Sequence, residues 1–138
     1  MKRTLLLLVF ALALFAVACR PGRPIGAFAY DVPTAAAHKP ITLQQMQDAI
    51  LKACVTHNWQ AREIQPNLIE ASIVVRGKHH VTVSIPYTAT HYSIKYKSSV
   101  NMEYKTKKDG TTVIHPNYNN WVANLDQSIR QNIAAYEF

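Results

Sequence analysis

The chain of 138 residues has room for one domain, and no internal repeat or low-complexity tract follows its first eighteen residues. Its formal net charge is +7, and without Lys2 and Arg3 the remaining 13 basic residues exceed the 8 acids by +5. A moderately basic surface is explained by scattered, solvated lysines, or by attraction to anionic lipid headgroups. Nucleic acid is excluded as a partner because the N-terminal segment indicates export.

The N-terminal segment is ordered like a secretory signal. Lys2 and Arg3 precede an apolar run that ends at Ala18 and is shorter than the ~20 residues of a spanning helix. Residues 1–18 are therefore predicted to be a signal peptide. Small residues directly before Cys19 are typical of a lipoprotein signal-peptidase site, so Cys19 is predicted to carry lipid. The alternative is an ordinary signal peptide cut after Ala18, which would leave Cys19 free or disulfide-bonded.

Residues 19–40 are predicted to form a flexible tether that holds the domain away from a membrane. The segment after Cys19 contains four prolines and two glycines and has no sustained periodicity. A short strand at residues 27–32 is expected within it, because Phe28, Tyr30 and Val32 alternate with smaller or polar residues.

The folded domain is predicted to span residues 41–138 and to begin with a helix. Thr42 and Gln45 have the spacing of a capping box, and the helix is expected to end near His57. Apolar residues at intervals of three and four place Cys54 on its buried face. These residues are Leu43, Met46, Ile50, Ala53 and Cys54.

The middle of the chain alternates between apolar and polar residues, as strands do. Three successive amphipathic strands joined by very short turns must be antiparallel, because a parallel crossover needs a dozen or more residues. The expected strands are residues 59–65, 68–76, 80–87 and 91–98, followed by a small hairpin of 102–105 and 112–114 around a turn at 107–110.

A second helix is predicted to close the domain, with Asn117 as its cap and an apolar stripe that runs to Tyr136. A sheet with one apolar face and two helices with one apolar stripe each bury one another in two layers. The predicted fold is therefore an α+β two-layer sandwich, in which an antiparallel sheet of three to five strands is packed by an N-terminal and a C-terminal helix.

No motif for catalysis, a cofactor or a metal occurs. His79 and His80 are adjacent, so on a strand they point to opposite faces and do not grip one ion together. We expect His80 on the outer face, opposite Arg76 and near Lys97, where cations oppose metal binding. Cys54 on a buried helix face would be a protonated, poor nucleophile. The sequence predicts no enzyme, no cofactor and no metal site.

The outer face of the sheet is the strongest candidate for a binding surface. It would be basic and rich in hydroxyls, able to donate hydrogen bonds to anions or polysaccharide; the alternative is that it is simply hydrated. Of the tyrosines, Tyr92 and Tyr96 are expected to face the core, and Tyr104 is the best candidate for an exposed ring. The face would carry Ser72, Thr82, Ser84, Ser93, Lys95 and Lys97, with Arg76, His80 and His91 at its margins, and the candidate ligand-binding residues are His80, Lys95, Lys97 and Tyr104.

Two stretches resemble a family of small, uncharacterised bacterial lipoproteins. They are "IPYTATHYSIKYKSSVNMEY" and "IHPNYNNWVANLDQSI", and the likeness covers residues 41–133. In this family a lipobox and a short tether precede a Trp-containing strand, a Tyr-Ser-Ile strand and a closing Ile-His, Tyr-Asn, Trp helix. The resemblance implies an envelope location but no activity. Arg20 after the cysteine, rather than Asp, implies the outer membrane.

The sequence thus predicts a cell-envelope lipoprotein, anchored through acyl chains on Cys19 at the periplasmic face of the outer membrane. Its domain is predicted to be a non-catalytic binding or assembly-accessory module, with other envelope proteins or cell-wall glycan as partners. The alternatives are an envelope enzyme acting on peptidoglycan or polysaccharide, and a carrier of a small ligand or metal that uses the histidines.

Overall fold

A computed structural model describes residues 20–138, so the predicted signal peptide and Cys19 lie outside the described residues. The chain forms two helices and eight strands in this range, and the order of elements is that of the sequence analysis with one strand, β1, added near the start. Their bounds are β1 Arg23–Pro24, β2 Phe28–Asp31, α1 Leu43–Thr56, β3 Gln60–Gln65, β4 Leu68–Val75, β5 His79–Pro86, β6 His91–Val100, β7 Lys105–Thr106, β8 Thr112–Ile114 and α2 Asn117–Glu137.

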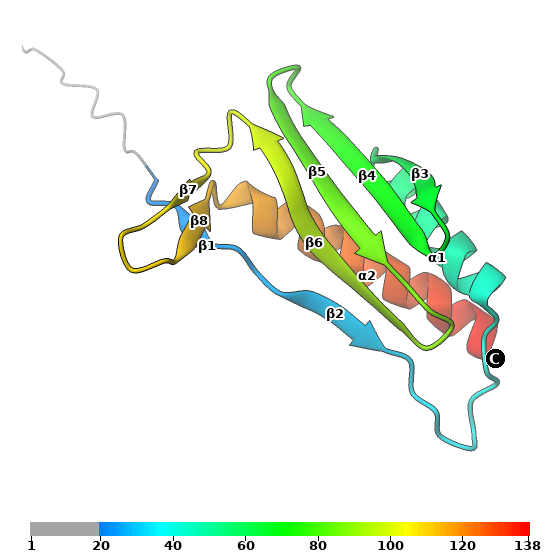
Figure 1. The fold of residues 1–138 in the computed structure, drawn as a ribbon. Helices are drawn as coiled ribbons and strands as arrows, with labels where there is room; N and C mark the ends of the chain where they lie inside the picture. Colours follow the sequence, from blue (N-terminus) through cyan, green and yellow to red (C-terminus); the bar gives the residue numbers. More distant parts are fainter. Residues whose placement is uncertain (1–19) are drawn as a thin grey trace, which may run out of the picture.

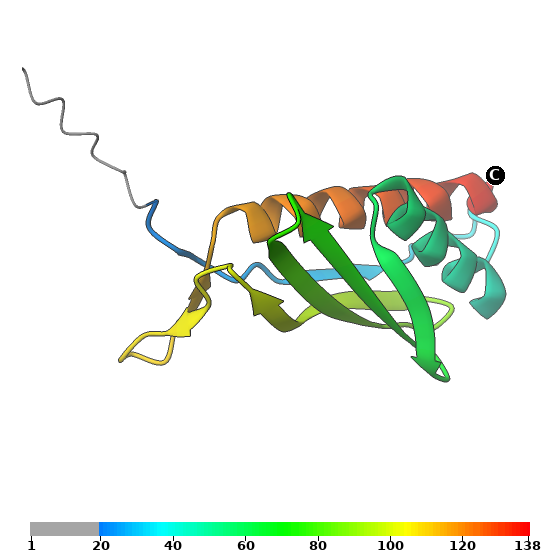
Figure 2. The ribbon, with the colours of Figure 1, turned by 90° about the horizontal axis from the view of Figure 1, so that it is seen from above.

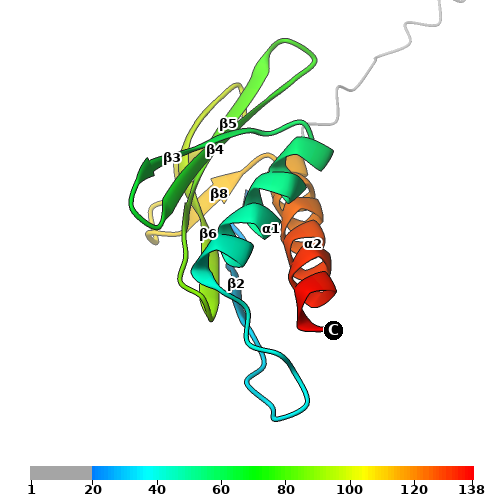
Figure 3. The same ribbon diagram turned by 90° about the vertical axis from the view of Figure 1, so that its right-hand side faces the viewer.

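The strands form two antiparallel sheets, one of five strands in the order β2-β6-β5-β4-β3 and one of three in the order β1-β8-β7. Helices α1 and α2 lie side by side across one face of the larger sheet (Figures 1 and 3). The predicted α+β sandwich is confirmed. No helix among residues 20–138 has the length and apolar character needed to cross a membrane.

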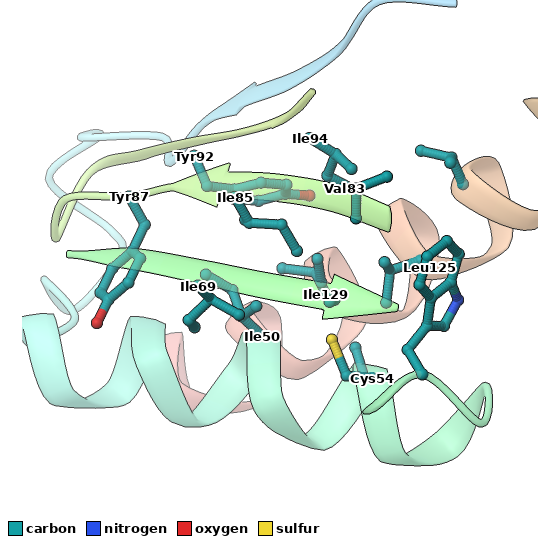
Figure 4. Close-up of a cluster of buried hydrophobic side chains, with 14 of the residues drawn as sticks. Ile50, Cys54, Ile69, Val83, Ile85, Tyr87, Tyr92, Ile94, Leu125 and Ile129 are labelled. Atoms are coloured by element: carbon teal, nitrogen blue, oxygen red, sulfur yellow. The ribbon is translucent and has the colours of Figure 1, made fainter. Parts of the chain in front are cut away.

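The core lies between the five-stranded sheet and the two helices, and Figure 4 shows its central side chains. Cys54 points into it from α1 and is completely buried, as predicted. Burial raises the pKa of the Cys54 thiol to about 12, because the charged thiolate would lose its hydration. Cys54 therefore packs in the core as a small apolar residue.

The first helix begins as predicted, whereas the second begins differently. The side chain of Thr42 accepts from the Gln45 amide, and the Gln45 side chain accepts from the Thr42 amide, which completes the capping box. Asn117 was expected to cap α2, but the cap position is occupied by Pro116 without a side-chain hydrogen bond. The backbone amide of Asn117 donates instead to Nδ1 of His115 at 3.2 Å, so an imidazole satisfies the first turn of the helix.

The segment predicted as a flexible tether is partly built into the domain. β1 pairs with β8, and β2 pairs with β6 as an edge strand of the larger sheet. The side-chain amide of Asn119 on α2 accepts from the Gly26 amide at 2.8 Å and donates to the Pro24 carbonyl at 2.9 Å. The short strand expected at residues 27–32 is confirmed as β2. The prediction of a flexible tether is wrong where the chain forms β1 and β2, because pairing with β8 and β6 and the hydrogen bonds of Asn119 hold these residues to the domain.

The β4–β5 turn sets a register that also differs from the prediction. Arg76 and Gly77 both have left-handed backbones, with φ of 54° and 68°, and the strands resume pairing at Val75 and His79. His80 consequently lies opposite Val74 rather than opposite Arg76. The face assigned to His80 is unchanged, since it is exposed on the outer side of β5 while its neighbour Val81 is buried.

Candidate functional site

The outer face of the five-stranded sheet is less basic than the sequence analysis expected. Glu70 on β4 forms an ion pair with Lys97 on β6, and Nη2 of Arg62 on β3 lies 3.8 Å from the same carboxylate. The Lys97 ammonium is the main cause of the lowered pKa of Glu70. Two cations of the outer face, Arg62 and Lys97, thus lie next to a carboxylate, whereas Lys95 is exposed beside Ser84.

The four predicted ligand-binding residues do not come together. Lys95 is opposite Ser84 on β5, whereas His80 is four residues further along that strand, about 13 Å at the rise of a β-strand, and is opposite Val100. Tyr104 is 46% exposed, but its ring stacks on Tyr96 at 4.4 Å between centroids. Tyr96 packs in turn against the buried Tyr118 of α2 at 5.8 Å, so Tyr104 belongs to the helix side of the sheet and not to its outer face.

A polar pocket of about 160 Å³ lies where the β4–β5 turn meets the start of α2. Four parts of the chain bring polar side chains to this pocket. The turn supplies a guanidinium, β5 supplies an imidazole, the residue after β8 supplies a second imidazole, and the first turns of α2 supply an amide and an indole. The lining residues are Val75, Arg76, His79, His115, Asn117 and Trp121.

The two imidazoles are held in different tautomers. Their ring centroids are 6.2 Å apart. Nδ1 of His79 lies 2.8 Å from the Asn101 carbonyl, which accepts only, so this nitrogen carries the proton. Nδ1 of His115 accepts from the Asn117 amide, so the neutral ring carries its proton on Nε2. In the neutral rings the remaining nitrogen of His79 is therefore an acceptor, whereas that of His115 is a donor.

Asn101 and the hairpin backbone hold His79 in this orientation. The side-chain amide of Asn101 donates to the Lys78 carbonyl at 2.9 Å, and the backbone carbonyl of Asn101 accepts from Nδ1 of His79. Its left-handed backbone, with φ of 56°, is one that asparagine tolerates. Arginine does not share this preference, so Arg76 at φ 54° is an unusual residue to find beside the glycine of this turn.

The pocket is electropositive and suits an anion. Arg76 forms no ion pair with any described residue, so its guanidinium remains available. The volume is well below the roughly 300 Å³ of a typical small-molecule site, which limits the occupant to one group such as a carboxylate or a phosphate. None of the lining residues is a serine, threonine or cysteine, so the pocket offers donors and no hydroxyl or thiol nucleophile. Residues 20–138 also contain no group of three or more His, Cys, Asp or Glu placed to hold a metal.

The sequence analysis did not find this pocket, because its residues are distant in the chain. His79 and His115 lie 36 positions apart and meet only when α2 packs against the sheet. The available signal was the motif "IHPNYNNW", which contains His115, Asn117 and Trp121 but was used only for the resemblance. Comparison of the chain with protein-family models, with curated proteins and with solved structures gave no match.

Proposed function

We propose that the chain is a lipid-anchored cell-envelope protein whose domain is a non-catalytic binding module. The observation that carries the binding role is the convergence of Arg76, His79 and His115 on one small pocket. The Arg76 guanidinium and the Nε2–H of His115 present N–H donors that match the oxygens of a carboxylate or phosphate, and hydrogen bonds to charged groups are the strong ones. His79 adds a donor when both of its ring nitrogens carry a proton, since its Nδ1–H is bonded to the Asn101 carbonyl. The ligand is therefore the anionic group of a larger envelope molecule.

The lipid anchor is supported by the sequence before Cys19, where small residues follow an apolar run. Two or three acyl chains on one cysteine hold a protein stably to a bilayer, whereas a single chain binds reversibly. The purified full-length chain is expected to float with lipid vesicles at high salt, and Cys19→Ala is expected not to. Equal flotation of both would contradict the anchor.

Binding in the pocket is tested by titrating the full-length chain in detergent with inorganic phosphate or acetate. The ring signals of His79 and His115 in NMR spectra are expected to move, while those of the outward-facing His80 stay in place. His79→Gln and Arg76→Asn should each weaken the affinity by roughly tenfold, the value of one hydrogen bond to a charged group. Asparagine tolerates the left-handed backbone at position 76, so the second substitution keeps the turn.

The adjacent histidines provide a matched control. His80→Gln removes the same chemical group one residue away, on the opposite face of β5, and is expected to leave the affinity unchanged. If His79→Gln and His80→Gln bind phosphate equally well, the pocket is not the binding site.

A further inference from the structure

One end of the molecule concentrates the positive charge of the domain. Five exposed cations lie there, close to the start of the described chain and on the β7–β8 hairpin, against two acids, Glu103 and Asp109. Together, the five cations and the two acids carry a net charge of +3, out of the +5 carried by the residues after Cys19. The five residues, called the basic end from here on, are Arg20, Arg23, Lys105, Lys107 and Lys108.

The two segments of the basic end are brought together by the three-stranded sheet. β8 is its central strand and pairs with β1 on one side and with β7 on the other, so Pro24 and Lys105 are both opposite Val113. The β7–β8 hairpin projects from the same end of the molecule at which the described chain begins and β1 lies (Figures 1 and 2). Segments 80 residues apart in the sequence thus form one charged surface.

The cations of the basic end are unpaired, as Arg76 is. None of the five forms an ion pair with a described residue, whereas Arg62 and Lys97 face Glu70, and Arg130 pairs with Asp126. Asp109 accepts from the Thr111 amide at 2.9 Å within the turn of the hairpin. The Asp109 carboxylate therefore stabilises the hairpin turn and forms no ion pair with the five cations.

The hairpin is held in a defined orientation relative to the sheet. Tyr104, directly before β7, stacks on Tyr96 of β6, and Met102 is buried. The His115 amide, directly after β8, donates to the Met102 carbonyl at 2.7 Å. Beside Arg23 lies a hollow of about 320 Å³ lined also by Pro116, Asn119 and Asn120, which offers amide donors next to the cation.

We propose that the basic end docks on the anionic phospholipid headgroups of the bilayer that holds the anchor. The inference rests on the proposed lipidation of Cys19, because Arg20 follows that residue directly and a lipid there would bring the basic end to the bilayer. Each Lys or Arg near an anionic surface strengthens its attraction about fivefold. Docking fixes which face of the domain points away from the membrane.

The test uses the full-length lipidated chain on vesicles of phosphatidylcholine with or without phosphatidylglycerol. A thiol-reactive fluorophore is placed at Thr106→Cys on β7, or at Gln65→Cys at the far end of β3, and quenching by nitroxide-labelled lipid reports contact. Cys54 stays unlabelled because its thiol is buried and its pKa is about 12. We expect stronger quenching at position 106 with phosphatidylglycerol at low salt than without it, and none at position 65.

Two double variants with equal loss of charge complete the design. Lys107→Gln/Lys108→Gln should lower the docked-to-free ratio roughly 25-fold, the product of two such factors. Lys39→Gln/Lys95→Gln, outside the basic end, should leave quenching unchanged. If the chain floats with the vesicles at high salt but position 106 is quenched equally with and without phosphatidylglycerol, or equally in both double variants, docking is refuted and the anchor stands. If the chain does not float, the anchor fails and the docking inference fails with it.

Discussion

Two groups of tyrosines lie towards opposite ends of the five-stranded sheet and meet different surroundings. Near the β5–β6 turn, the hydroxyls of Tyr87 and Tyr92 donate to the carboxylates of Glu63 and Asp126, at 2.9 and 2.7 Å. Near the start of α2, the rings of Tyr96, Tyr104 and Tyr118 pack on one another, and the buried Tyr118 hydroxyl has no hydrogen-bond partner. We call these the carboxylate-bonded tyrosines and the stacked tyrosines.

The difference separates a part of the molecule that is built for stability from one that holds functional candidates. Charge-assisted hydrogen bonds fix the carboxylate-bonded tyrosines against β3 and α2. The stacked tyrosines lie beside the left-handed Asn101 and Glu103, and near the Arg76 pocket and the basic end. Local rules are broken mainly where a chain has another task, and an unpaired hydroxyl next to strained backbone fits that pattern.

The largest expected effect comes from the buried carboxylate of Asp126. It accepts from the Tyr92 hydroxyl and from Nε of Arg130 at 2.9 Å, and the Arg130 guanidinium lies 4.4 Å from the centre of the Tyr30 ring. Asp126→Ala leaves Nε of Arg130 without its acceptor and leaves the Tyr92 hydroxyl only the Asp126 backbone carbonyl, at 3.3 Å. It should lower the free energy of unfolding by about 3 kcal/mol. Urea unfolding followed by tryptophan fluorescence measures it.

Asp31 provides the control for this substitution. Its side chain is 89% exposed and meets only His91, so Asp31→Ala should change the free energy of unfolding by less than about 0.5 kcal/mol. Similar losses in the two variants would contradict the stabilising role given to the carboxylate-bonded tyrosines.

A direct comparison of one tyrosine from each group should give a smaller effect. Burial raises the pKa of both hydroxyls, and Asp126 raises that of Tyr92 further. Tyr92→Phe removes a hydrogen bond to a charged group and should cost about 1.5 kcal/mol. Tyr118→Phe removes a buried hydroxyl without a partner, so its free energy of unfolding should stay the same or rise. Thermal unfolding of both variants checks this, and a marked loss for Tyr118→Phe would break the comparison.

The sequence predicted the parts of this molecule that local rules determine. The capping box of α1, the buried face with Cys54 and the alternation along β4 and β5 follow from spacing alone, and two amphipathic helices with one amphipathic sheet leave few ways to pack. The inward orientation of Tyr92 and Tyr96 was predicted for the same reason, because a period of two decides it.

Tertiary contacts decide what the sequence did not predict. The register of His80 depends on a left-handed Arg76, a conformation that no pattern assigns to arginine. The charge of the outer face depends on Glu70, whose partners are on other strands. The pocket forms only when His79 on the sheet and His115 before α2 come together in the fold. β1 likewise forms only by pairing with β8. Neither feature can be predicted without knowing which distant segments pair.

The smallest expected effect is a pH dependence of stability that comes from Glu63. This residue lies beside the carboxylate-bonded tyrosines and not beside the stacked tyrosines. Its carboxylate accepts from the Asn67 amide, the Tyr87 hydroxyl and the Gln47 side chain, which join β3, the β3–β4 turn, β5 and α1. The Asn67 amide, followed by the Tyr87 hydroxyl, lowers the pKa of Glu63 in the folded chain. A carboxyl group with a lowered folded pKa stabilises the fold above its unfolded pKa, about 4 for glutamate. That contribution is lost as the pH falls through the folded value.

Glu63→Gln should therefore lower the urea midpoint at pH 7, and the difference from the original chain should shrink as the pH falls below about 4. The effect is modest because the carboxylate is exposed to solvent. Glu103, beside the stacked tyrosines, forms no hydrogen bond or ion pair through its side chain within residues 20–138, so Glu103→Gln should show no such convergence. Urea titrations of all three chains at several pH values make the comparison. Glutamine has nearly the same shape as protonated glutamate, so a Glu63→Gln deficit that persists at low pH would show that the negative charge is not what joins β3 to Tyr87.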